Sequence, residues 1–131
     1  MPERASRTVI AFDFGLKRIG VAVGEPELRT AHPLPPIAAP GFDRIEKLLA
    51  EWRPAQLVVG LPVAEEGEHA LAKRVERFAR QLEGRFRVPV ARVDERFTSV
   101  EAESRLRGTK GKSIDSVAAQ LILEQYFDEA A

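Results

Sequence analysis

The sequence predicts an α/β fold in which a mixed five-stranded sheet carries helices on both faces. Three observations lead to this prediction. The first half of the chain contains three strand-like segments joined by short connections, as in an antiparallel meander. In the second half, strand-like and helix-like segments alternate, an order that requires parallel strands with helices packed on the sheet. The length of 131 residues fits one domain, which we expect to span residues 1–131.

The antiparallel part is predicted to comprise three strands. Segments 8–15 and 18–25 are rich in Val, Ile and Phe, and the short link between them at 15–17 predicts a hairpin. A cluster of prolines follows. Because proline donates no hydrogen bond to a ladder, the third strand, at about 29–34, is expected at an edge of the sheet. The prolines of this cluster are Pro33, Pro35, Pro36 and Pro40.

Helices and strands are predicted to alternate along the rest of the chain. Apolar residues recur every three or four positions in the helices and run continuously in the strands. In order, the predicted elements are a helix over 45–52 ended by Pro54, a strand over 57–60, a helix over 71–82 with Gly84 as its C-cap, a strand over 88–93, a helix over 98–106 opened by a capping box from Thr98 to Glu101, and a final helix over 113–128.

Composition excludes several classes of protein. Lys and Arg number 20 and so do Asp and Glu, and this formal net charge of zero argues against a broad nonspecific grip on nucleic acid. The absence of cysteine excludes disulfides and thiolate metal sites and fits a reducing cytoplasm. No apolar run approaches the roughly 18 residues of a membrane span, and the first residues do not resemble a secretory signal. We therefore expect a cytoplasmic protein that does not engage membranes.

Three carboxylates are flanked in the sequence by residues that would not normally surround a solvated acid. Asp13 ends an apolar strand, Glu95 closes another, and Asp115 opens the last helix. An ionised carboxylate removed from water costs several kcal/mol unless a cation or hydrogen bonds compensate for it. If the fold brings the three together, a divalent cation is the simplest compensation, because such ions take oxygen ligands. This pattern suggests a metal-dependent nuclease.

Each of these residues also has a structural explanation. Asp13 with the glycine at 15 could form a plain turn, since both residue types favour turns. Asp115 could complement the dipole of its helix, although it shares a helical face with apolar residues. Asp94 and Glu95 are adjacent, and spacing alone leaves open which of the two points inward.

Four segments, taken in order, resemble the YqgF/RuvX family of the RNase H-like superfamily. They are AFDFGLKRIGVAVG at 11–24, VVGLP at 58–62, DERFTSVEA at 94–102 and KSIDSVAA at 112–119. The resemblance implies an RNase H-like fold and a nuclease that processes the 5′ end of pre-16S rRNA, and the family has also been described as Holliday junction resolvases. The family's acidic triad carries over to Asp13, Glu95 and Asp115, which favours Glu95 over Asp94.

The expected chemistry is phosphodiester hydrolysis with two Mg²⁺ or Mn²⁺ ions. We assign Asp13 as the bridging ligand, with Glu95 and Asp115 each on one side. Gly15 would allow a tight turn or a close approach of a phosphate to the backbone. Basic residues near the acids are candidates for phosphate contacts. These are Lys17, Arg18, Arg96, Arg107, Lys110 and Lys112.

Two other classes of function compete with this hypothesis. Sugar-kinase and actin-like ATPases use an Asp-x-Gly hairpin to hold nucleotide phosphates, but they need two lobes around the nucleotide. A ribosome-associated RNA-binding factor could retain the acids without turnover. Among nucleases, a resolvase cuts two strands related by a twofold axis and should be a homodimer, whereas an rRNA-processing enzyme acting on a ribosomal particle can be a monomer.

Overall fold

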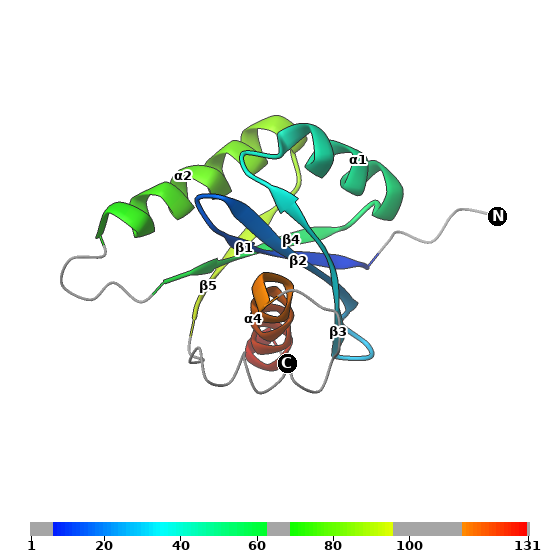
Figure 1. The fold of residues 1–131 in the computed structure, drawn as a ribbon. Helices are drawn as coiled ribbons and strands as arrows, with labels where there is room; N and C mark the ends of the chain where they lie inside the picture. The colour runs from blue at the N-terminus through cyan, green and yellow to red at the C-terminus, as the bar shows by residue number, and fades with distance from the viewer. Residues whose placement is uncertain (1–6, 63–68, 96–113, 131) are drawn as a thin grey trace.

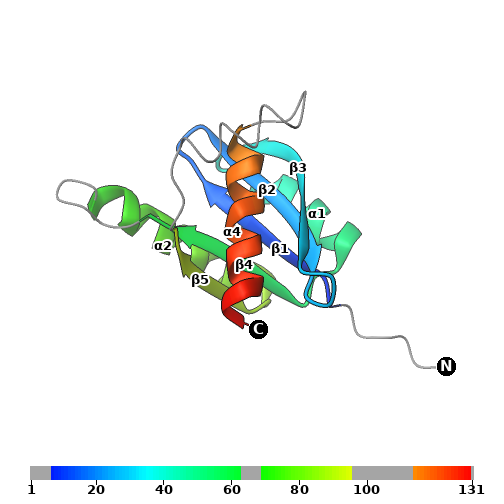
Figure 2. The ribbon, with the colours of Figure 1, turned by 90° about the horizontal axis from the view of Figure 1, so that it is seen from below.

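A five-stranded mixed sheet separates two layers of helices. The structure, a computed structural model, describes residues 7–62, 69–95 and 114–130. In Figure 1, α1 and α2 cover one face of the sheet and α4 the other, and Figure 2 shows α4 lying across the sheet. The elements are β1 (Val9–Phe14), β2 (Arg18–Glu25), β3 (Thr30–Ala38), α1 (Phe42–Trp52), β4 (Gln56–Leu61), α2 (His69–Phe86), β5 (Val90–Asp94) and α4 (Ile114–Ala130).

The sheet topology confirms the predicted fold class. The strand order is β3-β2-β1-β4-β5, in which β1–β2 and β2–β3 pair antiparallel while β1–β4 and β4–β5 pair parallel. Because β1, β4 and β5 run in the same direction, their carboxyl ends meet at one edge, the place where open α/β sheets bind ligands. The predicted helix over 98–106 lies outside the described residues.

Alternation along β1 divides the core between the two faces. Ile10 and Phe12 belong to the cluster under α1 and α2, whereas Val9 and Ala11 belong to the cluster under α4. This is the expected result of a side-chain period of two in a strand. Small side chains on the α4 side allow the helix to approach the sheet closely. They include Ala11, Ala22, Ala31 and Ala119.

The edge strand β3 is longer than its predicted 29–34 and contains a bulge. Between the pairs Val21–Leu34 and Ile19–Ile37, β2 contributes one intervening residue and β3 contributes two, Pro35 and Pro36. An edge strand tolerates prolines because one side of its backbone has no partner strand. The sequence rule that placed this strand at an edge was therefore right, but the prolines do not end it.

Gly84 does not end α2 as predicted. The helix continues to Phe86, and Arg87 follows it with a φ of 54°, its N–H donating to the Glu83 carbonyl at 3.0 Å. A left-handed residue after a helix is often glycine, but here an arginine adopts that conformation. Within the described ranges, no helix is long and apolar enough to cross a membrane.

Candidate active site

Asp13 lies at the carboxyl end of β1 on the face covered by α4. It follows Val9 and Ala11 at intervals of two, and both of those side chains are buried under α4. Asp13 itself is half-buried and pairs across the hairpin with Gly20 of β2. The strand therefore carries this carboxylate from the apolar core to the edge where the parallel strands end.

Glu95, rather than Asp94, points toward Asp13. The Glu95 N–H donates to the Leu61 carbonyl at 2.9 Å, which extends the β4–β5 ladder by one residue beyond β5. Val93 is buried under α4, so Glu95, two residues later, faces the same side, while Asp94 is exposed. The pair of acids that spacing alone left unresolved is thus distinguished by the alternation of the strand.

The carboxyl groups of Asp13 and Glu95 are close enough to influence each other's ionisation. Burial raises the pKa of Glu95 above its ordinary value of 4.5, and the interaction with Asp13 offsets part of that rise. A cation bound between the two groups would favour the charged form of both carboxylates.

Gly60 provides the space that Glu95 occupies. In β4 it pairs with Val93 of β5, and β1 lies on its other side. A Cβ added at Gly60 would lie 2.9 Å from Glu95 Oε1 and would collide with the Ile122 side chain of α4. The lack of a side chain in this strand lets the carboxylate pass between the sheet and the helix.

Ser116 fixes the first turn of α4 on the sheet. Its hydroxyl donates to the Leu34 carbonyl at 2.6 Å and accepts from the Val21 N–H at 3.4 Å. These two groups belong to the cross-strand pair next to the β3 bulge, so the hydroxyl provides hydrogen bonds where the regular ladder is interrupted. Ser116 is 1% exposed.

The Ser116 contacts also place the backbone of Asp115. Val21 directly follows Gly20, which is the cross-strand partner of Asp13. The start of α4, including the backbone of Asp115, is therefore held close to the pair formed by Asp13 and Gly20. The side chain of Asp115 lies outside the described part of the structure. Among the side chains that are described, no three His, Cys, Asp or Glu residues form a metal-binding group.

Replacing Ser116 with alanine should destabilise the protein by roughly 1–3 kcal/mol, because the buried Val21 N–H and Leu34 carbonyl would each lose this partner. Urea denaturation measures the change. Gln120→Ala is the matched control, since Gln120 lies on the same helix and its amide donates along the helix to Glu124 at 3.2 Å. If the free energy of unfolding falls no more in Ser116→Ala than in Gln120→Ala, the hydroxyl does not anchor α4.

The proposed phosphate-binding residues divide into two groups. Lys17 and Arg18 are exposed at the β1–β2 turn, next to the acids. A Cβ on Gly15 would lie 2.6 Å from the Arg18 carbonyl oxygen, so the tight turn itself accounts for this glycine. The other four residues, Arg96, Arg107, Lys110 and Lys112, fall outside the residues that the structure describes.

Sequence reasoning missed the structural roles of Gly60 and Ser116. A glycine inside an apolar strand often marks a close approach of another group, and the VVGLP segment contained that signal. A hydroxyl in the apolar stretch at the start of the last helix was a weaker signal, because its partners lie in β2 and β3, far away in sequence.

Comparisons with known proteins identify the family of this chain. The family model for RuvX, described as a Holliday junction resolvase, matches residues 7–129. A protein of Nitrosomonas europaea, named "Putative pre-16S rRNA nuclease", is 52% identical and covers 98% of this chain and 94% of its own length. A protein of Methylobacillus flagellatus with the same name is 51% identical, over 100% of this chain and 99% of its own.

Solved structures support the fold. T. thermophilus RuvC in complex with a Holliday junction substrate matches with a TM-score of 0.68 at 16% identity, over 94% of each chain. The Fowlpox virus resolvase in complex with Holliday junction DNA matches with a TM-score of 0.58 at 11% identity, over 94% of this chain and 98% of that one. The likeness to RuvC confirms the predicted RNase H-like fold. On the extent of the family match and the identity with its relatives, the chain belongs to the RuvX family.

Proposed function

We propose that this protein is a divalent-metal-dependent nuclease whose active site consists of Asp13, Glu95 and Asp115. The observation that carries the proposal is the juxtaposition of the half-buried carboxyl groups of Asp13 and Glu95 at the carboxyl ends of β1 and β5. Two half-buried carboxyl groups that face each other are unfavourable when both are ionised. A protein keeps such a pair when a positively charged ligand relieves the repulsion.

The donor atoms fit Mg²⁺ or Mn²⁺. Carboxylate oxygens suit these hard cations, and the chain has no cysteine that would favour a softer metal. The raised pKa of Glu95 is the second supporting observation, because it marks a site where an added positive charge would be strongly favoured. When bound, the metal would generate a hydroxide-like nucleophile and neutralise charge on the leaving oxygen.

The protein's own groups would position this chemistry. Asp13 lies nearest the centre of the sheet and is suited to contact both ions, with Glu95 on the β5 side and Asp115 on the α4 side. Gly60 leaves room for the Glu95 carboxylate, and Ser116 keeps α4 in register with β2. Exposed Lys17 and Arg18 at the adjacent turn would contact phosphates of the substrate.

For the substrate, we favour the 5′ region of pre-16S rRNA, processed in the cytoplasm on a ribosomal particle. The names of the relatives at about half identity support this choice. The test is to incubate the pure protein with a labelled pre-16S fragment, a single-stranded RNA and a four-way DNA junction, with and without Mn²⁺. Metal-dependent cleavage at a defined site in the pre-16S fragment is expected. Failure to cut any of the three would overturn the proposed activity.

Resolution of four-way DNA junctions is the second candidate, favoured by the description of the matching family and by the likeness to RuvC. A resolvase must make two cuts related by a twofold axis, so it should act as a homodimer. Paired cuts in the junction by a species of twice the chain mass would favour this function. A monomer that cuts RNA alone would favour rRNA processing.

The metal-free protein should become less stable as pH rises. Because the pKa of Glu95 is higher in the folded chain than its ordinary 4.5, the folded state binds more protons in that window. The stability from this group is fully present below pH 4.5 and is lost as pH rises through the folded-state pKa. Glu95→Gln should remove this part of the pH dependence and melt above the wild type at pH 8 in EDTA.

Thermal melting from pH 4 to pH 8, in EDTA and in excess Mg²⁺, measures this linkage. Added Mg²⁺ should raise the wild-type melting temperature at pH 8 and leave Glu95→Gln nearly unchanged, since ligand binding stabilises only the competent folded state. Parallel pH profiles for the two proteins in EDTA would contradict the buried position of the Glu95 carboxyl group.

A further inference from the structure

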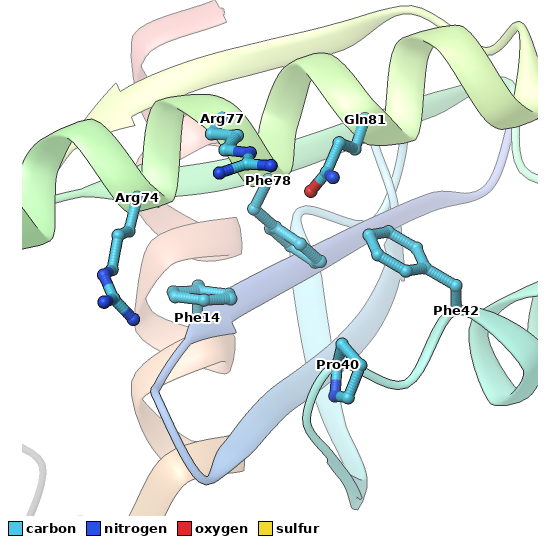
Figure 3. A pocket seen from close by; sticks show the side chains of 7 residues that line it. All are labelled: Phe14, Pro40, Phe42, Arg74, Arg77, Phe78 and Gln81. Carbon is cyan, nitrogen blue, oxygen red and sulfur yellow. The ribbon is translucent and has the colours of Figure 1, made fainter.

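An aromatic pocket with a basic rim lies on the face of the sheet opposite the acids. Its volume is about 310 Å³, at the lower end of the range for small-ligand sites. Figure 3 shows three phenylalanine rings side by side beneath α2, with two arginines and a glutamine reaching down from that helix. The rings are those of Phe14, Phe42 and Phe78, and the polar side chains are those of Arg74, Arg77 and Gln81.

The rings come from three separate elements and form a continuous apolar floor. Phe78 of α2 is 2% exposed, and its ring centroid lies 4.9 Å from that of Phe14 and 5.9 Å from that of Phe42. Phe14 and Phe42 are half-buried, so part of each ring faces the pocket. The Arg85 guanidinium lies 4.1 Å from the Phe42 centroid and holds that ring in place.

Charge on α2 is divided between two faces of the helix. Glu76 and Glu83, seven residues apart, each accept from Arg92 of β5 at 2.9 Å. Arg74 and Arg77 are exposed on the pocket side, and the described residues show no carboxylate paired with either of them. In a chain with no net charge, this arrangement gives a local site for an anion.

We infer that this pocket holds one unstacked nucleotide of the nucleic acid substrate. The half-buried rings of Phe14 and Phe42 can stack on a nucleobase. The two arginines can bind its phosphate, and the Gln81 amide can pair with a base edge. The volume suits one nucleotide rather than a helix or a folded peptide. This inference rests on the proposed nuclease function, because it assigns a binding subsite to the same substrate.

The pocket is close enough to the acids to serve the same strand. Phe14 directly follows Asp13, and neighbouring residues of a strand point to opposite faces. The pocket and the carboxyl pair therefore lie back to back at the end of β1. Between them is the exposed turn with Lys17 and Arg18, along which a single strand can pass from one face to the other. A nucleotide fixed in the pocket would set the register of the strand at the acids.

The test measures binding of a single-stranded RNA decamer that carries one 2-aminopurine, in the full-length chain with Asp13→Asn to prevent cleavage. The double variant Arg74→Gln/Arg77→Gln should weaken binding about tenfold and reduce the slope of log affinity against log salt by about 1.4. Phe42→Leu keeps the apolar volume but should weaken binding about tenfold and reduce quenching of the 2-aminopurine. Melting curves confirm that each variant folds.

Arg80→Gln is the matched control. Arg80 is exposed on α2 but lies on the helical face of Glu76 and Glu83, away from the pocket, so its loss should leave the affinity nearly unchanged. If the double variant and Phe42→Leu bind as tightly as Arg80→Gln, the nucleotide site is wrong, whatever the cleavage assays give. If they bind weakly while the wild type cleaves no substrate, the nuclease proposal fails and the binding site remains.

Discussion

Asp13→Asn is expected to reduce the rate of metal-dependent cleavage by a factor of at least roughly a thousand. Because each tenfold loss of rate corresponds to about 1.36 kcal/mol, the activation free energy should rise by about 4 kcal/mol. Asparagine has the same shape as aspartate but carries no negative charge, so it cannot neutralise the positive charge of the two metal ions. The single-turnover rate with saturating Mn²⁺ measures the effect. In EDTA the variant should melt at the same temperature as the wild type or above it, because one source of carboxylate repulsion against Glu95 is gone.

Asp94→Asn is the control for this experiment. Asp94 is exposed and faces away from the acid pair. The cleavage rate of the Asp94→Asn protein should therefore stay within about twofold of the wild type, as for most surface substitutions. An Asp13→Asn protein that cleaves at the wild-type rate would falsify the assignment of the active site. Equal losses in both variants would point instead to a general effect of surface charge on substrate binding.

Gly60→Ala is expected to reduce both activity and stability. The new methyl group would lie 2.9 Å from Glu95 Oε1 and would collide with Ile122, so either the carboxylate or α4 must move. Overpacking of this kind costs about 1–3 kcal/mol, and a displacement of about 1 Å at a catalytic group can reduce the rate about a hundredfold. Denaturant titration and the cleavage rate at saturating Mn²⁺ measure the two effects separately.

Gly84→Ala provides a matched glycine substitution. No atom lies within 4 Å of a Cβ built on Gly84, which sits inside α2. Alanine should therefore stabilise the protein by about 0.5–1 kcal/mol and leave cleavage unchanged. If Gly60→Ala behaves like Gly84→Ala, the space beside Glu95 is not needed. Combining Gly60→Ala with Ile122→Val should recover part of the stability and little of the activity, since only the contact with α4 is relieved.

Local sequence patterns were sufficient to predict the strands that carry the acids. The apolar run before Asp13 and the run before Glu95 each predicted a strand, and alternation with helices predicted that the strands are parallel. The family resemblance favoured Glu95 over Asp94, but the strand pattern alone could not choose between them without the face of β5 that lies under α4. Val93 identifies that face in the structure, because it is buried there.

Features that depend on contacts between distant segments could not be predicted. The pocket combines Phe14, Phe42 and Phe78, which come from β1, α1 and α2, so no local pattern brings them together. The bulge of β3 and its contact with Ser116 join segments more than 80 residues apart. Gly84 was misassigned because glycine favours helix ends, whereas packing of Phe86 against the core extends α2 by another turn.

The prolines of β3 have a consequence for assembly. Pro33, Pro35 and Pro36 lie in the outermost strand of the sheet, and none of them has an N–H to offer to an incoming strand. Such residues discourage the addition of a strand from another molecule and so protect against aggregation. Two copies of this chain are therefore not expected to join their sheets through this border.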